Sequence, residues 1–400
     1  MIGGFSFIFG GCASHTSSTI HECVFSGNAA TTGSGLFVHF HNSSQNNSVT
    51  VSSLYFTDNV CPGIRAKSHH AKREKHGGAV NIVFDDNSLN NAVTIEESNF
   101  INNTALSGGD LFILFLDSSH GNSIQIVASN FSNNGQGGNP PKQGGGLSVF
   151  LMDSSYSNTV SVNGTCFTRN RAMRGGGLSV LLMNSSYSNN ISINGTCFTE
   201  NRAMRGAEIH AQFQNLSEYN NLLVIWSSFI HNSRVSFINN SAVLNGGAIS
   251  YFTTDRHNFA SFRNCFIEYQ YFGQTTNINE RDIIFLFDGN TAISGNSIYA
   301  TTVEHCRRHL NCTTDPVHLF NCIGKFIFEK GESTYHQLAS AGVKFRVNSS
   351  NPFPLLVTPG KSFEIPIIML DEFGHPAQSL YNLHLSDPTN SFISRHTLFS

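Results

Sequence analysis

One sequence pattern recurs six times between Gly33 and Asn232: a Gly-rich start, an alternating apolar stretch, a polar turn, a second alternating stretch and Phe-x-x-Asn. Two adjacent copies, 144–174 and 175–205, have 31 residues each and agree at 25 positions. The opening glycine and the phenylalanine are 23 residues apart in every copy. Such a fixed internal length is typical of a solenoid, whose units bury their apolar faces only against one another.

Each copy predicts three short strands. In the copy 144–174, Leu147 and Val149 alternate with other residues, Val160 and Val162 do the same after a polar turn, and Phe167 lies in a third extended piece. Gly pairs would weaken a helix by roughly 1 kcal/mol per residue, and the Leu-x-x-Leu-x-Leu frame of leucine-rich repeats is absent. The sequence therefore predicts an all-β protein, with a right-handed parallel β-helix over residues 1–335.

The copies differ in length between Phe-x-x-Asn and the next glycine, which predicts insertions at one corner of the solenoid, where loops able to bind a partner would protrude. The predicted turns lie near 33–76, 77–107, 108–143, 144–174, 175–205, 206–245 and 246–300.

Equivalent residues of successive turns should lie about 4.8 Å apart in a parallel coil. This spacing predicts an interior stack of rings and a ladder of amides at the following bend, where asparagine tolerates left-handed backbone angles. The predicted stack contains Phe56, Phe100, Phe131, Phe167, Phe198 and Phe229, and the ladder contains Asn59, Asn103, Asn134, Asn170, Asn201 and Asn232.

A polar triplet recurs in the first turn of each copy, for example Asp153/Ser155/Asn158. It could form a row of calcium or sugar sites, but Asp and Asn alternate freely at its first position. Because a calcium site needs several carboxylate oxygens, we interpret the triplet as a side-chain-capped turn. The calcium-binding nonapeptide repeat also places an Asp shortly after its Gly pair, and only Asp110 fits that position.

The composition of the chain restricts its expected partners and its relation to a membrane. Charged residues make up 12% of the chain and the formal net charge is -3, so neither nucleic acid nor an anionic membrane is an expected partner. No apolar run approaches the roughly 18 residues of a membrane span. Residues 1–12 do not resemble a signal peptide, and we interpret the chain as a fragment or a mis-started gene model, so that any membrane anchor would lie outside this sequence.

N-glycosylation sequons are numerous, and together with nine cysteines they favour an extracellular or cell-surface protein. The candidate asparagines are Asn42, Asn46, Asn102, Asn130, Asn163, Asn184, Asn190, Asn194, Asn215, Asn239, Asn311 and Asn348.

Phe-x-x-Asn together with the Gly-Gly-Ala-Ile at 246–249 resembles the repeat of chlamydial polymorphic outer membrane proteins. The repeats are also similar to right-handed β-helix surface proteins of simple animals. The resemblance covers residues 1–335 and implies an extracellular β-helix with structural or adhesive roles and no catalytic residues.

From about Phe345 the pattern changes, and 336–400 resembles the first strands of an immunoglobulin-like sandwich, too short to be complete.

Many β-helices cleave polysaccharides, so acidic residues were considered as catalysts. Asp86, Asp117 and Asp153 share one repeat position and would form a carboxylate row, but no base accompanies them. The basic run 65–76 could bind acidic glycans or a metal, but it fills the longest insertion between turns, and we interpret it as a solvated corner loop. We predict no catalytic residue, metal or cofactor.

The cysteines offer several pairings. Cys166 and Cys197 are repeat equivalents close enough for a disulfide, and stacked free thiols would fit equally well. A bridge from Cys306 or Cys312 to Cys322 or Cys265 could close the end of the solenoid.

Taken together, the sequence predicts a non-enzymatic extracellular scaffold or adhesion module that presents loops and N-glycans to a protein or glycan partner. A carbohydrate-active β-helix enzyme and a bacterial adhesin passenger domain are the alternatives.

Overall fold

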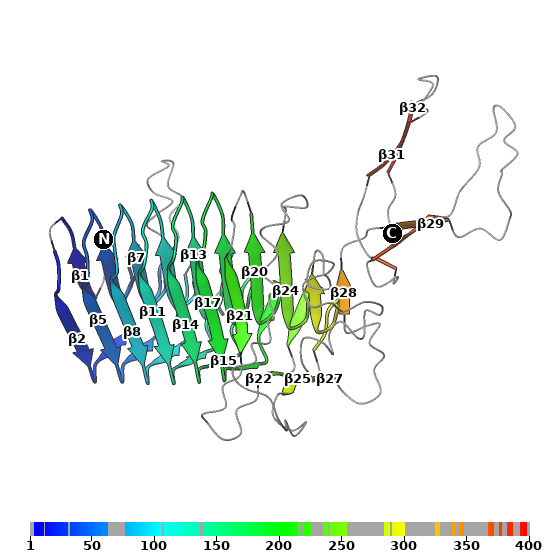
Figure 1. Ribbon diagram of the computed structural model, residues 1–400. Coiled ribbons are helices and arrows are strands. Elements are labelled where there is room, and N and C mark those ends of the chain that lie inside the picture. The colour runs from blue at the N-terminus through cyan, green and yellow to red at the C-terminus, as the bar shows by residue number, and fades with distance from the viewer. Residues whose placement is uncertain are drawn as a thin grey trace, which may run out of the picture.

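A computed structural model describes residues 4–11, 13–30, 33–62, 77–105, 108–136, 140–214, 217, 220–225, 235–238, 240–253, 284–288, 290–300, 325–328, 338–340, 344–347, 367–371, 376–377, 382–386 and 393–397. Every regular element within these ranges is a strand. The strands of successive repeats lie side by side and build a coil in which each turn stacks on the preceding one (Figure 1). The all-β solenoid predicted from the sequence is therefore confirmed.

Three long sheets of parallel strands form the coil. The first contains β1 (Phe5–Phe9), β4 (Leu36–Phe40), β7 (Val80–Phe84), β10 (Leu111–Phe115), β13 (Leu147–Leu151), β16 (Leu178–Leu182), β20 (Ile209–Phe213), β24 (Ile249–Thr253), β26 (Ile298–Ala300) and β28 (Leu338–Ser340). The second contains β2 (Ser17–His21), β5 (Ser48–Ser52), β8 (Ala92–Glu96), β11 (Ser123–Val127), β14 (Thr159–Asn163), β17 (Asn190–Asn194) and β21 (Asn221–Ile225). The third contains β3 (Val24–Ser26), β6 (Tyr55–Thr57), β9 (Asn99–Ile101), β12 (Asn130–Ser132), β15 (Cys166–Thr168), β18 (Cys197–Thr199), β22 (Val235–Ile238), β25 (Ile284–Asp288) and β27 (Lys325–Phe328).

Alternation along each strand places one set of side chains inside the coil. On β13, Leu147, Val149 and Leu151 are fully buried, and they pair in register with Leu178, Val180 and Leu182 of the next turn. Because identical or similar residues meet at each level, the interior is one continuous apolar core.

The interior contains two columns of phenylalanine rings. Neighbouring rings of the predicted column lie 4.5 to 5.1 Å apart between centroids and are nearly parallel, and the column runs through Phe25, Phe56, Phe100, Phe131, Phe167 and Phe198. A second column, which the sequence analysis did not identify, contains Phe9, Phe40, Phe84 and Phe115 at 4.8 to 4.9 Å. Offset parallel rings add to the energy of burial in both columns.

Two amide ladders run along the coil. In the predicted ladder, the backbone N–H and the side-chain Nδ2 of Asn134 donate to Oδ1 of Asn170 at 3.1 and 2.8 Å. The third residue of the polar triplet forms another ladder, in which Asn158 donates in the same way to Asn189 at 3.0 and 3.1 Å. Both ladders are buried, so each amide satisfies backbone groups at a corner that water does not reach.

The left-handed backbone angle lies one residue earlier than predicted. Arg169 and Glu200, which precede the ladder residues Asn170 and Asn201, have φ of 55° and 57°, and the ladder residues are not among those with positive φ. The ladder asparagines are therefore retained for their buried hydrogen bonds rather than for their tolerance of a left-handed angle.

The prediction that Phe229 and Asn232 of the sixth repeat continue the column and the ladder is wrong. Phe237, not Phe229, pairs with Phe198, and Oδ1 of Asn240 accepts from the backbone N–H of Asn201 at 2.9 Å. Phe229 and Asn232 lie outside the described residues. The chain contains the motif twice, and the second copy leads directly into the next glycine turn. The extra residues of this repeat therefore fall between β21 and β22, at a different corner from the earlier insertions.

The parallel coil extends beyond the predicted boundary at residue 335, because β28 pairs in parallel with β26. Further on, β29 (Lys344–Val347) pairs antiparallel with β30 (Ile367–Leu370), and β31 (Asn382–Ser386) pairs antiparallel with β32 (Ile393–Thr397). Two separate hairpin-like pairs do not define a sandwich, so the immunoglobulin-like part stays a prediction. None of the described residues forms a helix that could cross a membrane.

Candidate functional site

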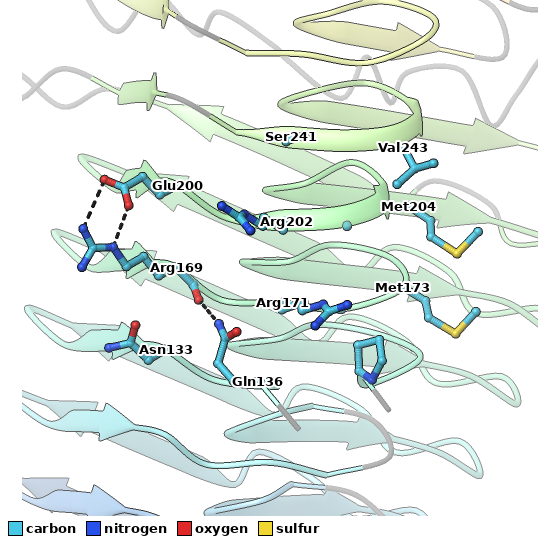
Figure 2. Close-up of a pocket in the computed structure, with 13 residues that line it drawn as sticks. Asn133, Gln136, Arg169, Arg171, Met173, Glu200, Arg202, Met204, Ser241 and Val243 are labelled. Carbon is cyan, nitrogen blue, oxygen red and sulfur yellow. Dashed lines mark hydrogen bonds and ion pairs between the residues drawn. The ribbon is translucent and has the colours of Figure 1, made fainter. Parts of the chain in front are cut away.

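A groove of about 620 Å³ lies at the corner that follows Phe-x-x-Asn in the turns 108–143 to 206–245 (Figure 2). One short strand, β19 (Arg202–Arg205), pairs there with β23 (Ser241–Asn245). The groove is lined by Asn133, Gln136, Pro140, Arg169, Arg171, Ala172, Met173, Glu200, Arg202, Ala203, Met204, Ser241 and Val243.

An ion pair borders one side of the groove. Nε of Arg169 lies 2.6 Å from Oε2 of Glu200 on the next turn, and Nη2 lies 3.4 Å from Oε1. The pair raises the pKa of the guanidinium and lowers that of the carboxyl. The Gln136 side chain donates to the carbonyl of Arg169 and ties this edge to the preceding turn.

Arginines occupy two further positions of the corner in both near-identical repeats. Arg171 lies opposite Arg202, and Arg174 lies opposite Arg205. Burial, and then repulsion from Arg205, lower the pKa of the Arg174 guanidinium. Since the one carboxylate of the groove, Glu200, is hydrogen-bonded to Arg169, this corner has a local excess of positive charge.

An exposed apolar residue lies between the two arginines in the sequence of the turns 144–174 and 175–205, and the next turns continue this apolar row. Met173 and Met204 are 41% and 40% exposed, and Val243 is 60% exposed. Figure 2 shows these three side chains in one row along the coil, with Arg171 and Arg202 beside them. Ile293 on the following turn is 59% exposed and continues the repeat position. The alanines between these residues are buried and anchor the strand to the coil.

Three titratable groups are buried at the start of strands of the first sheet: Asp110 before β10, Glu208 before β20 and His210 on β20. Burial raises the pKa of Asp110 and Glu208 well above ordinary values. Their contacts with Asn103 and Asn201 oppose the shift only in part, because neither reaches full hydrogen-bond geometry. Burial and then the charge of Arg174 lower the pKa of His210 to about 3. None of the three lines the groove, so they do not offer acid–base chemistry there.

The second sheet contains a Ser-His-Glu arrangement that the sequence does not predict. Nδ1 of His21 lies 2.8 Å from Oγ of Ser52, and Nε2 lies 3.1 Å from Oε1 of Glu22. A catalytic triad needs a shielded base and an oxyanion hole. Here the His21 and Glu22 side chains are 55% and 77% exposed on a sheet face, so the arrangement is a surface network.

The acidic row considered for catalysis is a series of turns. Asp86, Asp117 and Asp153 adopt φ of 46°, 47° and 51°, and the neighbouring asparagine donates from Nδ2 of Asn184 to Oδ1 of Asp153 at 2.9 Å. They lie in the turn between the first and second sheets, away from the groove. The basic run 65–76 lies outside the described residues. Among the described ranges, no group of three or more His, Cys, Asp or Glu could hold a metal ion.

Of the candidate disulfide cysteines, the structure links Cys166 to Cys197, whose Cα atoms are 4.6 Å apart. This is one of the two arrangements that the sequence left open. Cys265, Cys306, Cys312 and Cys322 lie outside the described residues.

The sequon asparagines differ in accessibility. Asn42, Asn46 and Asn102 are exposed, whereas Asn130, Asn163, Asn184, Asn190 and Asn194 are half-buried. Asn215, Asn239, Asn311 and Asn348 lie outside the described residues.

The groove was missed in the sequence although a signal was present. Both near-identical repeats contain Arg-Ala-Met-Arg, at 171–174 and 202–205. Read with period two, this segment places Ala172 inside and Met173 outside, and stacking the copies predicts a basic and apolar surface. The contribution of Val243 does not follow from this pattern, because the sixth repeat contains two Phe-x-x-Asn motifs and only stacking selects the one with Phe237.

The stacked parallel turns define a parallel β-helix repeat protein. The family model of the Chlamydia polymorphic membrane protein repeat matches residues 234–251. That segment contains Phe237, Asn240 and the glycine turn at 246–249, which are the residues that the structure places in register with the preceding turns. Comparisons with curated proteins and with solved structures found no match. The chain is thus a β-helix with a repeat like that of the polymorphic membrane proteins.

Proposed function

We propose that this chain is the non-enzymatic scaffold of an extracellular or cell-surface adhesion protein, which presents a corner groove and N-glycans to a partner. The observation that supports this most is the groove itself: it is open, basic and apolar, and its one carboxylate is hydrogen-bonded to arginine. Such a surface suits binding, whereas hydrolysis of a glycoside needs two carboxyl groups facing one bond. The repeat match to a membrane protein of Chlamydia agrees with a surface location.

The test of location uses cells that express the native protein. A membrane-impermeant biotin reagent should label the chain on intact cells, and N-glycosidase should reduce its apparent mass. We expect occupied sequons at Asn42, Asn46 and Asn102, because an exposed asparagine is accessible to the transferase. A chain that becomes labelled only after cell lysis would contradict the surface role.

A bacterial passenger domain is the second candidate, favoured by the Chlamydia repeat match. A surface-labelled chain that contains no N-glycan would support it over the glycoprotein. The enzyme alternative is separated by incubating the purified chain with polygalacturonate or alginate and calcium. We expect no unsaturated product and no new reducing ends, and formation of either would overturn the non-enzymatic function.

A further inference from the structure

We propose that the groove binds an acidic amphipathic α-helix of a partner protein, which lies along the axis of the coil with its apolar seam on the Met173 row. This inference rests on the proposed scaffold function and specifies the partner. The Met173 row is defined as Met173, Met204, Val243 and Ile293.

The composition of the surface favours a protein over a polysaccharide. Methionine and arginine are enriched in protein interfaces, and methionine adapts its shape to different apolar partners. The residues that line the groove include no aromatic ring on which a sugar could stack. Four exposed apolar side chains in one row would also remain uncovered by a strongly hydrated polyanion.

The charges favour an acidic partner. Arg171 and Arg202 line the groove and form a basic row next to the Met173 row. Arg174 and Arg205 lie opposite each other at the end of the same segment, but they do not line the groove, and their charges act on the buried His210. The nearby Glu200 is hydrogen-bonded to Arg169 and lies on the opposite side of the groove from the Met173 row (Figure 2).

The spacing favours a helix. Successive turns of the coil are about 4.8 Å apart, so the Met173 row spans about 14 Å. A helical heptad seam places an apolar residue about every 5.2 Å along the axis, and three such steps cover about 16 Å. An extended peptide along the same direction repeats its face about every 6.8 Å and would lose register over this length. Acidic residues that flank the seam would face Arg171 and Arg202.

The probe is a synthetic peptide of three heptads with Leu at a and d and Glu at e and g. Its Glu residues repel one another and oppose self-association, but they complement the arginines. Binding to the purified full chain is measured by calorimetry at low and at physiological ionic strength. We expect binding that weakens with salt. Arg171→Gln with Arg202→Gln should weaken it about tenfold, and so should Met173→Ser with Met204→Ser.

Controls separate the alternatives. A scrambled peptide of the same composition should not bind, and Gln125→Ala, at an exposed position of β11, should leave the affinity unchanged. Circular dichroism of each variant checks that the coil is intact. The proposal would be overturned if the scrambled peptide bound equally well, or if the variant Met173→Ser with Met204→Ser bound the designed peptide with unchanged affinity. Heparin or polygalacturonate binding that depends on the arginines alone, without peptide binding, would assign the groove to a polyanion instead. Absence of peptide binding by an intact coil would refute the helix but leave the surface location standing.

Discussion

At the scale of single residues, buried polar groups distinguish this coil from an ordinary apolar core. Each ladder asparagine spans two neighbouring turns: Nδ2 of Asn170 donates to the carbonyl of Phe131 on one side and to Oδ1 of Asn201 on the other, at 2.9 and 3.1 Å. These groups are fully satisfied, and such buried hydrogen bonds stabilise the fold mainly because leaving one unmade is costly. Asp110 and Glu208 are the opposite case, since their oxygens lack partners of normal geometry.

The buried ionisable groups predict a stability that depends on pH. Burial raises the pKa of Asp110, so its destabilising effect is absent below the unfolded value near 3.8 and grows as the pH rises above it. The variant Asp110→Asn should therefore gain stability relative to the parent between pH 4 and 7, by at most about 1.4 kcal/mol per pH unit. Urea unfolding at several pH values measures the difference.

His210 provides a control of opposite sign. Its pKa is lowered from 6.5 to about 3. The contribution of the neutral imidazole to the free energy of unfolding is therefore fully present above pH 6.5 and is lost as the pH falls toward 3. His210→Gln should remove that loss on acidification. If the free energy of unfolding changed with pH in the same way for the parent and both variants, neither group would be buried as described.

At the scale of the elements, glycine opens every turn because of contact as well as backbone angle. Gly175 has φ of +62°, and a Cβ there would lie 2.1 Å from the carbonyl oxygen of Leu178. Gly164 has φ of +56°, but a Cβ there would meet nothing within 4 Å. Non-glycine residues occupy the equivalent position on the two preceding turns, where Ala128 and Glu97 have φ of 48° and 50°.

These two glycines are a matched pair for substitution. Gly164→Ala should cost about 1 kcal/mol, the usual penalty of a left-handed angle. Gly175→Ala should lower the free energy of unfolding by about 4 kcal/mol or more. The added Cβ would also clash with the carbonyl of Leu178, so the start of the strand would have to shift. Denaturant unfolding of both variants measures the difference, and similar losses would show that contact contributes little.

At the scale of the whole molecule, the coil is a sum of similar turns joined by nearest-neighbour contacts. The disulfide between Cys166 and Cys197 joins two of these turns through side chains as well as backbone. The groove exists only because the turns that contain Arg171, Arg202 and Ser241 stack without a long insertion at this corner. Function at this corner therefore depends on register along the coil.

Removal of one complete turn should preserve the fold. Deletion of 144–174, combined with Cys197→Ser, joins Gln143 to Gly175 in place of Gly144, so Phe131 and Asn134 would meet Phe198 and Asn201 in register. We expect β-sheet circular dichroism and cooperative thermal unfolding to persist. Deletion of 144–177 removes three residues more and shifts the register, which should abolish cooperative unfolding. If both deletions behave alike, nearest-neighbour register does not control the stability of the coil.

The sequence alone determined the parallel coil, the Phe56 to Phe198 column and the first amide ladder, because a local pattern that repeats must repeat its structure. It also contained the arginines and methionines of the groove. Which of two identical motifs continues the column was decided only by tertiary stacking: Phe237 brings Ser241 and Val243 next to Arg202 and Met204, whereas Phe229 would have left a loop there. Periodicity specifies what a turn looks like, but only packing against the preceding turn selects which residues form it.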